Sequence, residues 1–168
     1  MSVHIQSYVR RVTINRVRVA RLARAILANV GETSAELGIL FVGDQRMRGL
    51  NHRYRGKDRT TDVLAFAMRE GPGPRIFRQV RGGSLRPTPD MLGDVVIAVP
   101  TAVRQAKQGW RSLDEELTAL LIHGILHLCG YDHERNEKEA RRMHRRERMV
   151  LRSLSRLMNQ ADSGRGSG

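Results

Sequence analysis

The sequence predicts an α/β or α+β protein built around one mixed sheet. Segments with helical periodicity interleave with three or four short apolar runs that have the length of strands. The chain has 168 residues, which is enough for one domain with a substantial core. We expect this domain to occupy residues 1–158 and the remaining residues, 159–168, to form a disordered tail.

Five segments have the three- and four-residue spacing of apolar side chains that is typical of helices. These predicted helices lie at residues 16–30, 45–54, 101–109, 115–129 and 135–158. Asn15, Asp44 and Asp114 are the expected caps of the first, second and fourth helix, because short polar side chains accept hydrogen bonds from first-turn amides. Gly31 and Gly130 follow the first and fourth helix, where a left-handed residue commonly ends a helix.

Three shorter segments have the composition of strands. They lie at residues 36–42, 61–67 and 92–99. Residues 71–90 hold four of the five prolines and show no clear period, so they predict a loop with one weak strand at 75–80. The N-terminal residues carry no continuous apolar stretch of the secretory type.

The composition is strongly basic. Thirty Lys and Arg residues against seventeen Asp and Glu residues give a net charge of +13, which favours polyanionic partners such as nucleic acid. Aromatic residues make up only 4%, so phosphate contacts are expected to dominate over base stacking. No run of 18 apolar residues predicts a membrane span. The single cysteine, Cys129, excludes an internal disulfide and favours a reducing, cytoplasmic location.

Three histidines fall within eleven residues, in the segment HGILHLCGYDH. His123 and His127 are four residues apart on a predicted helix and therefore share one face. Gly130 allows the chain to turn back and bring His133 to the same point. Three imidazoles without a fourth protein ligand are typical of an open catalytic zinc site that keeps one water. We predict one zinc ion per chain at this site, although other divalent metals also bind imidazole.

The histidine spacing matches the zinc-protease motif H-E-x-x-H-x-x-G-x-x-H, with one difference. Gly124 occupies the position of the glutamate general base, which argues against a peptidase. Three carboxylates are candidates for orienting the histidine rings, and each is equally suited to a cap or turn: Asp62, Asp94 and Asp132. Cys129 follows the second histidine by two residues on the helix, so we expect it to point away as a small buried side chain.

A basic segment, LNHRYRGKDRTTDVLAFA, lies between a predicted helix and a predicted strand at residues 50–67. Its four clustered cations are Arg53, Arg55, Lys57 and Arg59. An arginine held near a metal can bind a phosphate group and neutralise the charge that develops on it. A solvated turn at Gly56 is the alternative interpretation, and His52 is expected on the helix surface rather than as a ligand.

The segments HGILHLCGYDH, LNHRYRGKDRTTDVLAFA and LGDVVIAV resemble the signature stretches of the YbeY family, which are single-domain metal-dependent endoribonucleases. The resemblance covers residues 36–150. It implies an α+β fold with a mixed four-stranded sheet packed with helices, and a metal site on a helix of the C-terminal half. It implies zinc held by His123, His127 and His133, with Arg55 lining the same cleft. It also implies cleavage of ribosomal RNA precursors, notably at the 3′ end of the small-subunit RNA, and a role in ribosome quality control.

We therefore expect cleavage of single-stranded RNA, with a zinc-bound water or the RNA 2′-hydroxyl as nucleophile. Arg55 and His123 are the predicted catalytic residues, and ribosomal RNA and the small ribosomal subunit are the expected partners. Three alternatives remain open. The first is a non-catalytic ribosome-assembly or RNA-binding factor with a structural metal. The second is a zinc peptidase, and the third is a membrane-surface protein that uses the basic helix 135–158.

Overall fold

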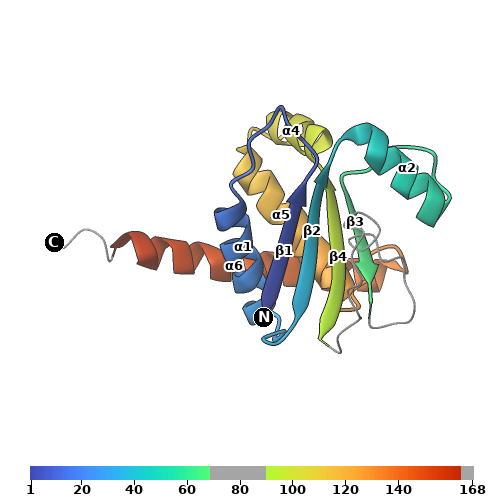
Figure 1. Cartoon of the computed structure of the whole chain (residues 1–168). Helices are drawn as coiled ribbons and strands as arrows, with labels where there is room; N and C mark the ends of the chain where they lie inside the picture. Colours follow the sequence, from blue (N-terminus) through green and yellow to red (C-terminus); the bar gives the residue numbers. More distant parts are fainter. Residues whose placement is uncertain (69–89, 164–168) are drawn as a thin grey trace.

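The computed structural model describes residues 1–68 and 90–163, which form a single α+β domain (Figure 1). Its sheet has four strands in the order β1-β2-β4-β3. Their bounds are Ser2–Ser7 for β1, Glu36–Val42 for β2, Val63–Ala67 for β3 and Met91–Ala98 for β4. Because β1, β2 and β4 are parallel and β3 is antiparallel to β4, the predicted mixed sheet of four strands is confirmed.

The N-terminal strand β1 was not predicted from the sequence. Val3 and Ile5 alternate with polar side chains there, but two apolar residues are too short a run to distinguish a strand from a loop. In the structure these residues pair in parallel with Leu37 and Ile39 of β2, and β1 forms one edge of the sheet. The weak strand predicted at 75–80 lies outside the described residues.

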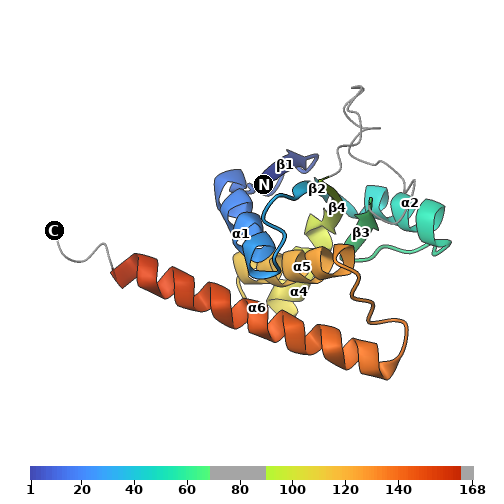
Figure 2. The same cartoon turned by 90° about the horizontal axis from the view of Figure 1, so that it is seen from below.

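Each of the five predicted helices is present. Their bounds are Arg16–Asn29 for α1, Asp44–Arg55 for α2, Val99–Gln108 for α4, Leu113–Leu128 for α5 and Glu137–Ser163 for α6. Figure 2 shows α1, α5 and α6 on one side of the sheet and α2 on the other. The helix α6 crosses beneath α5 and α1 and continues past the body of the domain. No helix in the described part of the chain is long and apolar enough to cross a membrane.

The two faces of the sheet bury two separate groups of apolar side chains. On β2, Ile39 and Phe41 face the main core, which α1, α5 and α6 cover. Leu40 and Val42 point the opposite way and pack with Met47 of α2. This alternation follows from the two-residue period of a strand. Both faces of the central strands are therefore buried, which explains their almost continuous apolar sequence.

The observed helix caps correct two predictions. Asn15 caps α1 as expected, because its side chain accepts a hydrogen bond from the amide of Arg18. Asp44, however, is the first residue of α2 and follows the cap Gly43; its carboxylate binds α4 instead. The cap of α5 is Ser112, not Asp114, and the Ser112 hydroxyl accepts from the first-turn amide at a distance of 3.1 Å.

The last helix is longer than predicted. It continues to Ser163, so residues 159–163, which we expected in a disordered tail, are helical. Its N-terminal turn is capped by Asn136, whose side-chain oxygen accepts from the amide of Glu139 at 2.9 Å. Met143 and Val150 of α6 are buried in the main core, in agreement with the helical spacing of apolar side chains predicted for this segment. Residues 164–168 lie outside the described part of the chain.

Candidate metal centre and cleft

The three clustered histidines are brought together by the end of α5 and the turn that follows it. His123 and His127 lie one turn apart on α5. Gly130 adopts a left-handed backbone conformation with φ of 96°, and its amide donates to the carbonyl of His127. The amide of Tyr131 donates to the carbonyl of Leu126, which completes a Schellman motif. This turn reverses the chain and returns His133 to the first two rings.

The three imidazole rings form a nearly symmetrical cluster. Each pair of ring centroids is 4.9 Å apart, and the ring planes cross at 62–71°. One nitrogen from each ring can be chosen so that all three lie within 4.8 Å of one another. Nε2 of His127 is 2.9 Å from Nδ1 of His133. Nitrogen ligands about 2.0–2.1 Å from a tetrahedral zinc ion are about 3.3 Å apart, so the cluster fits such an ion after small ring rotations.

A carboxylate from the last helix orients the first ring. Nδ1 of His123 lies 2.5 Å from Oε1 of Glu147 on α6. Burial raises the pKa of Glu147, but its hydrogen bonds and attraction to His123 and His144 outweigh this and hold that pKa below its usual value. The ionised carboxylate therefore accepts a hydrogen bond from Nδ1–H of His123, which leaves the lone pair on Nε2 of that ring available to a metal ion.

Glu147 was not predicted from the sequence as an orienting residue. The signal was present, because Glu147 interrupts the apolar stripe of the helix between Met143 and Val150. An acidic residue on the packed side of a helix requires a partner, since an unpaired buried charge is costly. The identity of that partner could not be deduced, because His123 is 24 residues earlier in the chain.

The second histidine of the cluster, His127, is neutral at physiological pH. Burial is the largest cause that lowers the pKa of His127 to about 4, and the neighbouring His123, His133 and Arg55 lower it further. Asp132 opposes this shift but does not cancel it. A neutral imidazole has a free lone pair, which is the form that binds a metal ion.

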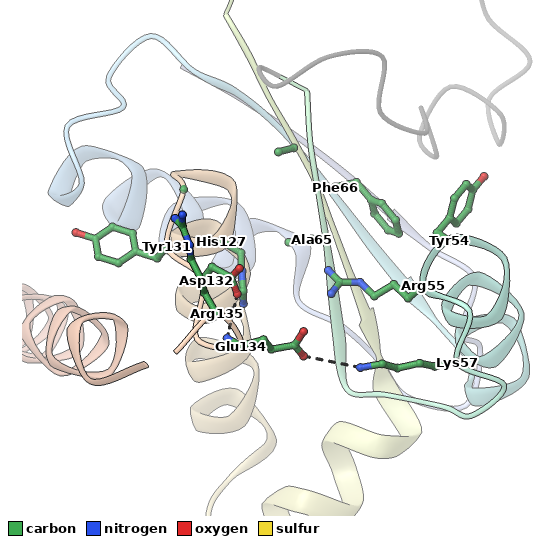
Figure 3. Close-up of a pocket in the computed structure, with 12 residues that line it drawn as sticks. Tyr54, Arg55, Lys57, Ala65, Phe66, His127, Tyr131, Asp132, Glu134 and Arg135 are labelled. Carbon is green, nitrogen blue, oxygen red and sulfur yellow. Dashed lines mark hydrogen bonds and ion pairs between the residues drawn. The ribbon is translucent and has the colours of Figure 1, made fainter. Parts of the chain in front are cut away.

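The histidine cluster lies in a basic cleft. A hollow of about 280 Å³ around the rings adjoins a larger one of about 850 Å³, and Arg55, Lys57 and His127 line both. Figure 3 shows Arg55 and Lys57 extending into the larger hollow from the end of α2, opposite the α5–α6 connection. Nζ of Lys57 lies 4.0 Å from Oε1 of Glu134, which links the two walls. Arg55 thus lines the same hollow as the three histidines.

The three aspartates proposed to orient the rings have other partners or lie on the other face of the sheet. Asp132 accepts a hydrogen bond from the amide of Glu134, which is the turn role that we gave as the alternative. Asp62 accepts from the amide of Val63 and from the side chain of Gln105. Asp94 lies on the sheet face shared with Val96 and Ala98, opposite the face that α5 covers.

Two other expectations concern His52 and Cys129. His52 is exposed on α2, as predicted. Cys129 is half-buried and packs against the main core, so it is less buried than expected. Among the described residues, the group suited to a metal contains the three histidines and no fourth ligating side chain.

Gly124 is required by the close packing of α5 on the sheet. A Cβ atom at this position would lie 2.7 Å from Cγ1 and 3.1 Å from Cγ2 of Val95, and 3.4 Å from Cγ2 of Val63. The position that carries the general base of a zinc peptidase therefore has no room even for a methyl group. This geometry agrees with the argument against a peptidase.

Comparison with known proteins identifies the family. The family model described as Endoribonuclease YbeY matches residues 4–155. The chain belongs to the YbeY family. An Endoribonuclease YbeY from Geobacter metallireducens is 43% identical over 157 residues, covering 93% of this chain and 97% of that protein. Another, from Aquifex aeolicus, is 37% identical and covers 86% of this chain and 87% of that one.

A solved structure supports the same fold. A solution structure from Thermotoga maritima matches with a TM-score of 0.59 over 98% of this chain and 97% of that chain. The sequence identity is 21%, so this match concerns the fold alone. The YbeY match includes Arg55 and the histidine cluster, and the resemblance inferred from the sequence segments is confirmed.

Proposed function

We propose that this chain is a metal-dependent endoribonuclease that processes ribosomal RNA. The observation that carries the proposal is the convergence of His123, His127 and His133 beside Arg55 in a basic cleft. Membership of the YbeY family supports it, because relatives at 37–46% identity carry the name endoribonuclease. The 3′ end of small-subunit RNA as the substrate, the small ribosomal subunit as a partner and a cytoplasmic role in ribosome quality control belong to the same proposal.

The donor set favours zinc. Three imidazole nitrogens are the ligands of catalytic zinc sites with an open position, whereas structural zinc is usually enclosed by four ligands, often cysteines. The single cysteine, Cys129, is not part of the cluster. When bound, the ion supplies Lewis acidity toward a phosphate oxygen and lowers the pKa of water. This donor set makes a purely structural metal the weaker proposal.

The side chains of the cleft have distinct roles in this proposal. Arg55 binds the scissile phosphate and neutralises the charge that develops on its oxygens. Glu147 fixes the ring of His123 through Nδ1, and burial keeps His127 unprotonated. Lys57 lines the cleft on the Arg55 side and contacts flanking phosphates. Attack by water or by the RNA 2′-hydroxyl agrees with the lack of a carboxylate at Gly124.

The proposal is tested by measuring the metal content and the RNA cleavage rate of purified variants. We expect His123→Ala to lose both bound metal and activity. Arg55→Ala should keep the metal and lose about 100- to 1,000-fold in rate, the usual effect of removing one group that stabilises transition-state charge. Arg10→Ala is the matched control, because Arg10 is exposed and lies outside the cleft. Undiminished cleavage by metal-free His123→Ala would refute the proposal.

A further inference from the structure

A row of basic side chains follows one face of α6. Its members are Lys138, Arg141, Arg145, Arg148, Arg152 and Arg156, which we call the α6 basic row. They are separated by three or four residues throughout, which places them within an arc of about 80° on the helix surface. The row is about 27 Å long, at 1.5 Å of rise per residue.

The α6 basic row is exposed and almost free of ion pairs. All six side chains are exposed to solvent. Arg141 has a contact of 3.6 Å with Glu137, whose own side chain is 94% exposed. The other five make no ion pair within the described part of the chain. Two neighbouring arginines outside the row are engaged with the protein: Arg142 stacks on Tyr131, and Arg146 donates to the carbonyl of Asn29.

Such a row is unfavourable for the helix by itself. Like charges three or four residues apart repel one another and destabilise a helix. The row contains five such neighbouring pairs in sequence. An anion with charges repeated along its length would remove this repulsion, and arginine is well suited to phosphate because its planar group donates two parallel hydrogen bonds.

The chemistry of α6 favours the backbone of a nucleic acid over a membrane surface. Helices that lie on membranes insert an apolar face. In α6 that face is already used, because Met143, Val150 and Leu154 are buried in the main core. The exposed apolar side chains of α6, Met149, Leu151 and Leu157, point in directions spread over about 200° and form no such face. The helix contains no Phe, Tyr or Trp, so it offers no aromatic ring for base stacking. The partner is therefore recognised by its phosphates.

The row begins where the cleft ends. Arg135 lines the larger hollow, and Lys138 follows it within the first turn of α6. From there the helix leads away from the cleft, beneath α5 and α1 (Figures 1 and 2). We propose that the α6 basic row binds the sugar–phosphate backbone of an RNA substrate outside the cleft. This inference rests on the proposed function, because the cleft supplies the point from which the RNA continues.

The test compares two variants of the full chain that lose the same charge. Arg148→Gln/Arg152→Gln changes the row, and Arg10→Gln/Arg11→Gln changes the connection between β1 and α1, which Figure 1 places near α4, away from α6. Each lowers the net charge from +13 to +11. Binding and cleavage are measured with a hairpin of about 40 nucleotides, longer than the row of about 27 Å, and with an RNA of about five nucleotides.

We expect the row variant to bind the hairpin at least about tenfold more weakly, with a salt-dependence slope smaller by about 1.5, because each lost phosphate contact removes about 0.7–0.9. Its binding and cleavage of the short RNA should match the unmodified chain. The variant should unfold at the same temperature or higher, since like-charge neighbours have been removed. The control variant should keep the hairpin slope and affinity to within about threefold.

Three results would overturn the inference. The first is an equal loss of hairpin affinity in the row variant and the control variant. The second is a row variant that loses no hairpin affinity. The third is a row variant that keeps its RNA binding but loses binding to phosphatidylglycerol vesicles, which would assign the row to lipid. A failure of the proposed function is distinguishable, because then the unmodified chain cleaves neither RNA. Hairpin binding that still depends on Arg148 and Arg152 would support the row in that case also.

Discussion

Replacing Gly124 by alanine should disturb the metal centre through the packing of α5 on the sheet. The added Cβ would lie 2.7 Å from Cγ1 of Val95, which is 0.7 Å closer than the lower limit of ordinary contact at 3.4 Å. Val95 is fully buried, and the close packing of protein interiors leaves little free volume for such a side chain to move into. Overpacking of this kind costs about 1–3 kcal/mol. Alanine recovers about 1 kcal/mol of helix propensity, so we expect a net loss of about 1 kcal/mol.

A double-mutant cycle tests this reasoning. Val95→Ala alone should cost about 2 kcal/mol by leaving a cavity. In the double variant the new methyl group enters that cavity, so the combined cost should be smaller than the sum by at least about 1 kcal/mol. Gly49→Ala in α2 is the control, because a Cβ there has nothing within 4 Å and should stabilise the protein by about 1 kcal/mol.

The assay is urea unfolding of the metal-free variants, followed by zinc titration against a chelator. Because Gly124 is flanked by the first histidine, a shift of α5 should weaken zinc binding about tenfold in Gly124→Ala. In the double variant, Val95→Ala should restore part of the zinc affinity that Gly124→Ala removes. Additive free energies of unfolding, or a Gly124→Ala variant as stabilised as Gly49→Ala, would refute the close-packing argument.

Three further predictions concern single residues. Glu147→Gln should weaken zinc binding about 10- to 100-fold in chelator competition with little loss of folded protein; unchanged affinity would show that the carboxylate does not orient His123. Since folding lowers the pKa of His127 to about 4, the unfolded metal-free chain binds more protons between that value and about 6.5, so stability should fall as the pH falls through this window. We expect the free energy of unfolding to fall by about 1–2 kcal/mol, a value already reduced for the partial exposure of His127, and to fall less in His127→Gln. Urea unfolding with the same pH dependence in both proteins would contradict the assignment to His127. Asp44→Ala should cost about 1 kcal/mol, because it removes 2.7 Å hydrogen bonds from Thr101 and Arg104 of α4. Asp58→Ala, which breaks an exposed ion pair with Arg48, should leave thermal unfolding unchanged; equal effects of the two substitutions would contradict the tie between α2 and α4.

The histidine cluster could be predicted because its geometry is local. Helical periodicity places His123 and His127 on one face, and a glycine three residues after His127 permits the reversal that returns His133. These distances depend on one helix and one turn, and not on the arrangement of the rest of the fold. The same reasoning identified Gly124 as the position where a peptidase would need glutamate, although only the structure shows the contact with Val95.

The parts that could not be predicted depend on contacts between distant segments. β1 is stabilised by pairing with β2, about 34 residues later, and its own two apolar residues give a weak signal. Glu147 acts across the interface between α5 and α6, so its role requires the tertiary packing. The predicted caps Asp44 and Asp114 were wrong by one and two positions. The cap of α2 is Gly43, which has no side chain to indicate the position, and Ser112 and Asp114 are both suitable caps at the start of α5.

The most direct test of the account is the metal content of the purified chain measured together with its RNA cleavage. We predict one zinc ion per chain, loss of cleavage when a chelator removes it, and recovery when zinc is restored. His133→Ala should bind zinc much more weakly, whereas His52→Ala, which changes an exposed histidine of α2, should retain one ion and full activity. RNA cleavage that persists in the fully metal-free protein would contradict the central claim.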